Sequence, residues 1–159
     1  MRWNELRSVG DEFFAHAPVR TTVDIKVPVT PDRLWQALAA DDAVLSWSPL
    51  VTGTTWRGDR GVGAVRTVTI ARALSVREVF YRWDENSRMT FAAEATTGPG
   101  IRVFAEDYVI TARPDGAALS WTVALDLPAG ARLLGTPASL ALRPAISSLA
   151  RGLRAQLTR

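Results

Sequence analysis

Apolar and polar residues alternate in the first and last strand-like segments of the chain. In TVDIKV, Val23, Ile25 and Val27 alternate with polar residues, and ALSWTVALDL has the same period of two. This period is typical of a strand with one buried face. Five further strand candidates lie between them, bounded by turns rich in glycine, aspartate or proline: residues 51–57, 64–71, 77–84, 89–97 and 101–112. The pattern predicts seven strands.

Helical periodicity appears after the first strand and again at the C-terminus. In VTPDRLWQALAA, Thr30 is a favourable N-cap and Pro31 suits the first helical position, while DDAVLSW predicts a second short helical turn. Residues 136–157 predict one long helix, capped by Thr136, with Pro144 as the site of a kink or restart. Its apolar residues recur at a spacing of three or four: Leu142, Ile146, Leu149, Leu153 and Leu157.

The order of these elements predicts an α+β fold. An antiparallel sheet of seven strands curls strongly, and the long apolar-faced helix can cover its buried face. A helix laid across a curled sheet leaves a hollow beside the line of contact, and such a hollow can hold a ligand. We expect one domain over residues 1–159. The first sixteen residues show a weaker amphipathic pattern, so residues 1–16 are expected to form an N-terminal amphipathic extension.

Composition and charge exclude several classes of protein. The chain has 159 residues, of which 47% are hydrophobic, as in a soluble globular domain. It has no cysteine and one histidine, His16, which excludes disulfides and a multi-histidine metal site. No apolar run approaches the roughly 20 residues of a membrane span, and no signal-peptide core is present, so we expect a cytoplasmic protein. The net charge is only +3 and the arginines are scattered, which argues against nucleic-acid binding. We expect neither a metal nor a cofactor.

Several segments together resemble a known family. PVTPDRLWQALA, WSPLVTGTTWRG, GVGAVRTVTI, VREVFYRWDENSRMTF and FAEDYVITARPDGAALSWTVAL, followed by the long helix, look like the polyketide cyclase/dehydratase-like branch of the START superfamily, also called SRPBCC. The resemblance covers about residues 21–157. It implies a helix-grip fold, in which a curved seven-stranded antiparallel sheet wraps around the C-terminal helix, with two short helices after the first strand. It also implies a deep, mostly apolar cavity whose usual cargo is a lipid, a sterol, a polyketide or another hydrophobic small molecule.

Two positions test the resemblance to members that act as aromatases and cyclases. In those members a tryptophan followed closely by a proline lines the cavity, and Trp47 with Pro49 resembles that pair. Alternatively, Trp47 closes the core between the short helices and the sheet. The same members resemble one another in an inward arginine on the fourth strand. Alignment on DENSR places Tyr81 there, and this departure weighs against cyclase chemistry.

Three charged residues share a phase with apolar neighbours on their strands. Arg66 is in phase with Val68, Arg77 with Tyr81, and Glu106 with Phe104 and Tyr108. A charge that points into an apolar hollow must be paired, so an arginine and Glu106 are expected to pair there or to hold the polar head of a ligand. We expect Arg77 to orient that head. If a strand has the opposite phase, its charge is instead solvated.

Ligand binding is therefore the favoured function. The predicted lining comprises Trp47, Arg66, Arg77, Tyr81, Phe91, Glu106, Tyr108, Trp121, Leu142, Ile146 and Leu149. The sequence has no nucleophile paired with a base, no phosphate loop and no metal set, so a carrier or sensor is favoured over an enzyme. A cyclase or dehydratase acting in the same cavity is the first alternative. A lipid-transfer protein with transient membrane contact, or a protein-binding module, is the second. The expected partner is a hydrophobic small molecule, and the protein is expected to be a monomer or a homodimer.

Overall fold

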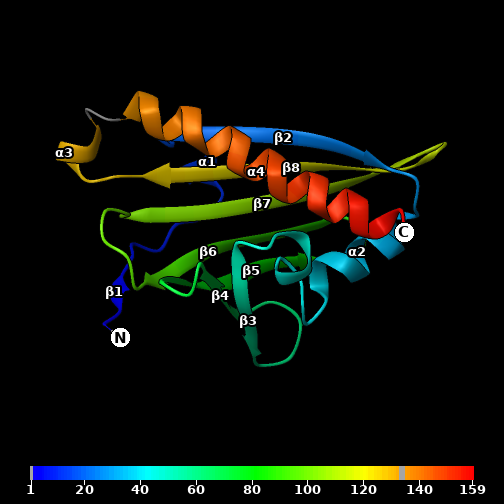
Figure 1. Ribbon diagram of the computed structural model, residues 1–159, viewed down its shortest axis with the longest axis horizontal. Coiled ribbons are helices and arrows are strands. Elements are labelled where there is room, and N and C mark those ends of the chain that lie inside the picture. The colour runs from blue at the N-terminus through cyan, green and yellow to red at the C-terminus, as the bar shows by residue number, and fades with distance from the viewer. Residues whose placement is uncertain (1, 133–134) are drawn as a thin grey trace.

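One antiparallel sheet curls around helix α4 and forms most of the molecule (Figure 1). The computed structural model describes residues 2–132 and 135–159, and side chains other than those of residues 131–140. Within these residues the strands lie in the order β2 (Val19–Val27), β8 (Gly116–Asp126), β7 (Val103–Arg113), β6 (Arg88–Thr96), β5 (Leu74–Asp84), β4 (Val65–Ile70) and β3 (Val51–Arg57). The predicted α+β fold with seven antiparallel strands is confirmed, and a further two-residue strand near the N-terminus joins the same sheet.

The two short helices follow the first long strand, as predicted. In α2 (Pro31–Ala39) the Thr30 hydroxyl accepts a hydrogen bond from the Arg33 backbone N–H at 3.3 Å, so the predicted N-cap is confirmed. Leu34 and Leu38 of this helix are fully buried. The second helix is a single 3₁₀ turn, η1 (Leu45–Trp47). Both helices lie at one end of the curled sheet.

Helix α4 (Gly135–Leu157) lies along the face of the sheet that we call the inner face. It continues past Pro144, so the predicted restart does not occur. Pro144 is exposed on this helix. The predicted Thr136 cap lies in the segment whose side chains are outside the description. A further short helix, α3 (Ala129–Arg132), precedes α4 and has no counterpart in the sequence prediction.

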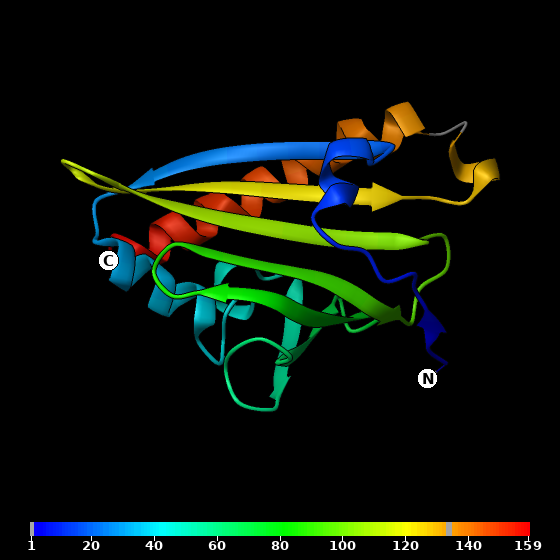
Figure 2. The ribbon, with the colours of Figure 1, turned by 180° about the vertical axis from the view of Figure 1, so that it is seen from behind.

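The N-terminal segment covers the opposite, outer face of the sheet (Figure 2). Its strand β1 (Asn4–Glu5) pairs with β6, and the five-residue helix α1 (Glu12–His16) follows. Phe13 of α1 packs in a small apolar cluster with Ala92, Val103, Ala105 and Ala124. Strand β7 is therefore buried on both faces, which explains why both of its faces carry apolar residues.

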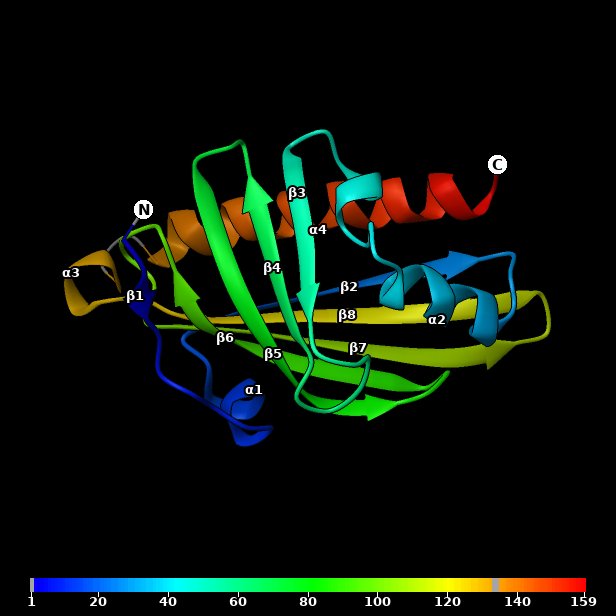
Figure 3. The same ribbon diagram turned by 90° about the horizontal axis from the view of Figure 1, so that it is seen from below.

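Irregular pairing between β5 and β6 bends the sheet. Phe80 pairs with Phe91 and Arg82 with Thr90, so Tyr81 is an extra residue in β5. Such a bulge increases the local twist and bends the bulged strand. Strands β3, β4 and β5 turn toward α4 (Figure 3).

Candidate functional site

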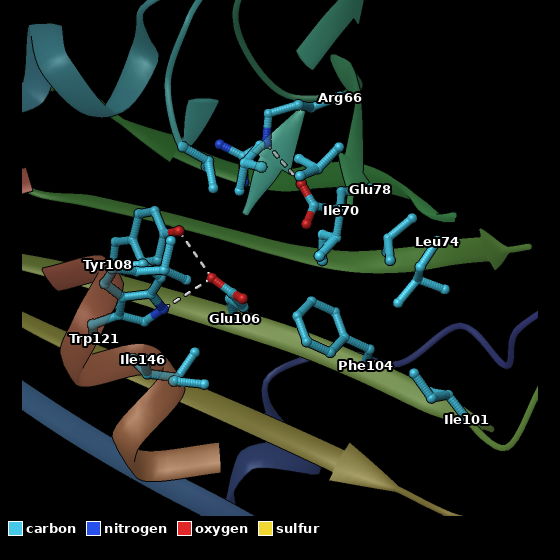
Figure 4. A pocket seen from close by; sticks show the side chains of 16 residues that line it. Arg66, Ile70, Leu74, Glu78, Ile101, Phe104, Glu106, Tyr108, Trp121 and Ile146 are labelled. Atoms are coloured by element: carbon cyan, nitrogen blue, oxygen red, sulfur yellow. Dashed lines mark hydrogen bonds and ion pairs between the residues drawn. The ribbon is translucent and has the colours of Figure 1, made fainter. Parts of the chain in front are cut away.

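A cavity of about 220 Å³ lies between the inner face of the sheet and α4 (Figure 4). Strands β4 and β5 form one wall, strands β7 and β8 the other, and α4 closes the side. Most of the lining is apolar, and the polar side chains gather toward one end. The lining residues are Val44, Val51, Arg66, Val68, Ile70, Leu74, Val76, Glu78, Ile101, Phe104, Glu106, Tyr108, Trp121, Ala145, Ile146 and Leu149.

Arg66 and Glu78 form a buried ion pair in the cavity wall. They lie opposite each other on β4 and β5, and the Arg66 Nε donates to the Glu78 Oε2 at 2.7 Å. The two residues are 1% and 4% exposed. The guanidinium carbon also lies 4.8 Å from the centre of the Phe91 ring and 5.4 Å from that of Trp56. The aromatic faces and the carboxylate together offset the cost of burying this charge.

Glu106 is the second buried carboxyl group of the cavity. Its Oε2 accepts a hydrogen bond from the Tyr108 hydroxyl at 2.8 Å and another from the Trp121 Nε1 at 2.9 Å. Among the described residues, none donates to Oε1. Figure 4 shows this second oxygen turned away from the two rings. One carboxyl oxygen is therefore held by the protein, and the other is available to the cavity.

Burial changes the protonation of this cluster. It raises the pKa of Glu106 to about 8, and the nearby Glu78 carboxylate adds to the effect, while Arg66 and the two hydrogen bonds oppose it. Burial also raises the pKa of Glu78, against the attraction of Arg66. The pKa of Tyr108 lies well above its ordinary value, first because of burial and then because of Glu106. Arg66 needs a counter-charge at every pH, and Glu78 is bonded to it directly. We therefore take Glu78 as ionised and Glu106 as the neutral acid near pH 7.

The structure brings six of the predicted site residues to the cavity wall, which are Arg66, Glu106, Tyr108, Trp121, Ile146 and Leu149. Three others belong to the surrounding core and do not line it. Trp47 packs edge-on against Trp121, with ring centres 5.9 Å apart, so the alternative in which Trp47 closes the core holds. Phe91 packs against Tyr108, and Leu142 is a partly buried residue at the edge of the core.

The predicted inward orientation of Arg77 and Tyr81 is wrong. Arg77 lies on the outer face, where its guanidinium carbon is 4.3 Å from the centre of the Trp3 ring and its Nη1 is 3.5 Å from the Glu94 Oε1. Tyr81 lines a separate hollow on that face, beside Val79. The two residues do share a phase, but the other phase of β5 faces α4. Arg77 therefore cannot orient a ligand in the cavity.

The sequence analysis missed Glu78, although a signal for it was present. The tight turn at residues 71–73 pairs Ile70 with Leu74, and this register sets Arg66 opposite Glu78. Pairing the two strands as a hairpin through this turn would therefore have predicted Glu78 as the partner of Arg66. Phe104 and Ile101 were also missed as lining residues.

The described residues contain no group of three or more histidine, aspartate or glutamate side chains that could hold a metal ion. No helix in the described part of the chain has both the length and the hydropathy needed to cross a membrane.

Comparison with known proteins identifies the family. Residues 18–158 match the family model described as polyketide cyclase / dehydrase and lipid transport. The chain belongs to this family. Uncharacterised proteins from Mycobacterium tuberculosis and Mycobacterium bovis are each 34% identical to this chain over 143 residues, which is 87% of this chain and 82% of theirs.

Several solved structures have a fold similar to that of this chain. A START superfamily protein from Mycobacterium smegmatis aligns with a TM-score of 0.70 at 14% identity, over 88% of this chain and 96% of that one. Ara h 8.0201 aligns with a TM-score of 0.69 at 16% identity, over 87% and 96%. A point mutant of norcoclaurine synthase from Thalictrum flavum aligns with a TM-score of 0.66 at 12% identity, over 87% and 93%. At these identities the likeness establishes the fold alone.

Proposed function

We propose that the protein binds a hydrophobic small molecule in the cavity between the sheet and α4, as a carrier or a sensor. The observation that carries the proposal is the cavity itself, which is lined mostly by apolar side chains and has its polar groups toward one end. Membership of a family described by lipid transport and polyketide cyclisation supports the same function.

The size and polarity of the cavity define the expected ligand. Its volume of about 220 Å³ lies just below the range of about 300–1,000 Å³ that is usual for small-molecule pockets, so the ligand is expected to be small. Burial of its apolar surface would stabilise the complex by roughly 25 cal/mol per Å². We expect the polar end of the ligand near Glu106, and its apolar body toward Leu74 and Ile101 (Figure 4).

Filling the cavity tests this function. Val76 lines the cavity, whereas Val79 lies on the outer face of the same strand. Val76→Phe removes space from the cavity, so we expect it to lower ligand occupancy at least tenfold. Val79→Phe adds the same phenyl ring outside the cavity and should leave occupancy unchanged. The measurement is native mass spectrometry of each protein purified from its own host, followed by identification of the bound molecule. The proposal fails if Val76→Phe keeps the wild-type occupancy, or if no small molecule is found in any of the proteins.

A cyclase or dehydratase acting in the same cavity is the second candidate function. The observation in its favour is Glu106, because a carboxyl group with a pKa of about 8 beside a ligand cavity is suited to general acid–base work near neutral pH. Conversion of the co-purified molecule by the wild-type protein, but not by Glu106→Gln, would support an enzyme over a carrier.

A further inference from the structure

We propose that the cavity selects a neutral ligand that carries an oxygen acceptor, such as a ketone, an aldehyde or an ester, and that the Glu106 carboxyl group donates the hydrogen bond to it. The proposal rests on the proposed function, because it names the ligand class of that same cavity.

The arrangement around Glu106 sets the direction of this hydrogen bond. The Tyr108 hydroxyl and the Trp121 Nε1 both donate to Oε2. This oxygen therefore already accepts two hydrogen bonds. The proton of a neutral carboxyl group must then reside on Oε1. This is the oxygen that no described residue contacts with a hydrogen bond, and it faces the cavity (Figure 4). A neutral Glu106 therefore presents an O–H donor to the ligand.

The charge balance of the cavity favours a neutral ligand. The Arg66 guanidinium and the Glu78 carboxylate compensate each other at 2.7 Å, and the rest of the lining is largely apolar. A ligand carboxylate would place a second negative charge beside Glu78, with Arg66 as the one cation among the described lining residues, and a ligand ammonium would require Glu106 to ionise while buried. Each charge would also be transferred from water into an apolar space, which is costly without a full set of partners.

The groups around Glu106 restrict what can titrate at this site. Arg66 faces it from β4, Glu78 from β5 and Tyr108 from β7, and from β8 it meets the Trp121 indole, which does not ionise. The described α4 residues that line the cavity are apolar, namely Ala145, Ile146 and Leu149. Arg66 keeps its charge, because its pKa is raised further. The pKa of Tyr108 lies well above its usual value, so Tyr108 also stays protonated. Loss of the Glu106 proton is thus the event that removes the donor as the pH rises.

Four matched probes test the proposal by isothermal titration calorimetry. They share a naphthalene body and differ in the head: methyl naphthyl ketone, ethylnaphthalene, naphthoate and naphthylmethylamine. We expect the ketone to bind about tenfold more tightly than the hydrocarbon, because one hydrogen bond is added, and both to bind more tightly than either ion. Ketone affinity should be highest well below pH 8 and fall as the pH rises through about 8, while hydrocarbon affinity stays level.

Two substitutions separate the role of Glu106 from general effects. In Glu106→Gln the amide oxygen can accept from Tyr108 and Trp121 while the amide N–H₂ faces the cavity, so the preference for the ketone should lose its dependence on pH. Glu106→Leu should abolish the preference for ketone over hydrocarbon. Glu94→Gln, on the outer face beside Arg77, is the matched control and should keep the wild-type pH profile.

The outcomes distinguish this inference from the function on which it rests. Equal affinity for ketone and hydrocarbon, or tighter binding of the amine or the naphthoate, would overturn the assignment of the head group and leave ligand binding intact. A pH dependence that persists in Glu106→Gln would likewise overturn it. Binding of none of the four probes would contradict both the inference and the proposed function.

Discussion

Arg66 and Glu78 lie opposite each other on neighbouring strands, and their ion pair is almost completely buried. Such a pair contributes little compared with apolar residues of the same volume, but breaking it leaves one buried charge without a partner. Burial of either side chain is therefore tolerated only while its partner is present. By contrast, Arg77 and Glu94 form a partly exposed pair on the outer face, where water screens both charges.

This difference predicts the effect of removing one carboxylate. Glu78→Gln should lower the free energy of unfolding by about 3–5 kcal/mol, because Arg66 loses its counter-charge in the core. Glu94→Gln should lower it by less than about 1 kcal/mol. The double variant Arg66→Met/Glu78→Leu should regain most of the loss. Urea unfolding measures all three. A loss at Glu78 no larger than the loss at Glu94 would contradict the buried pairing.

At the scale of elements, the position of α4 depends on a close approach to η1. A Cβ atom placed on Gly152 would lie 1.8 Å from the carbonyl oxygen of Trp47, far inside van der Waals contact. Only glycine allows the helix to lie this near to the backbone of the 3₁₀ turn. The Trp47 ring of the same turn packs against Trp121, whose Nε1 donates a hydrogen bond to Glu106.

We therefore predict opposite effects for two glycine substitutions in helices. Gly152→Ala should destabilise the protein by about 1–3 kcal/mol or more, because α4 or η1 must move to admit the methyl group. Gly130→Ala in α3, where a Cβ meets no atom within 4 Å, should be neutral or stabilising by up to about 1 kcal/mol. Thermal unfolding followed by circular dichroism gives both values. Equal effects of the two substitutions would show that α4 does not approach η1 so closely.

At the scale of the whole molecule, the sheet separates two layers with different roles. Helix α4 and the cavity lie on the inner face, and the N-terminal segment lies on the outer face (Figures 1 and 2). The cluster around Phe13 is distinct from the larger core that surrounds the cavity. Stability and ligand binding should therefore be separable by substitution on one face or the other.

Truncation of Phe13 tests this separation. Phe13→Ala should lower the free energy of unfolding by about 3–5 kcal/mol, because a buried aromatic ring is lost from the outer cluster. The folded variant should bind methyl naphthyl ketone with wild-type affinity. Leu50→Ala is the control, since Leu50 is 66% exposed and its truncation should change neither quantity. Chemical unfolding and calorimetry measure the two effects, and a large loss of affinity in Phe13→Ala would show that the two layers are coupled.

Local patterns in the sequence determined the elements and part of the site. Alternation predicted β2 and β8, turn residues bounded the strands between them, and Thr30 with Pro31 predicted the start of α2. Arg66 and Tyr108 were assigned to the hollow because each shares a phase with apolar neighbours. Those assignments followed from the two-residue period of a strand and from the rule that a buried charge must be paired.

Tertiary structure decided what alternation could not, which is the face that each strand turns toward the cavity. Strand β5 carries apolar residues in both phases, since the N-terminal segment covers its outer face, and the pattern alone therefore gave Arg77 the wrong side. The bulge at Tyr81 then changes the phase within the strand. The pairing of Arg66 with Glu78, and the free Oε1 of Glu106, depend on which strands lie side by side. Contacts between residues far apart in sequence set these features, because burial and hydrogen bonding are properties of the assembled layers.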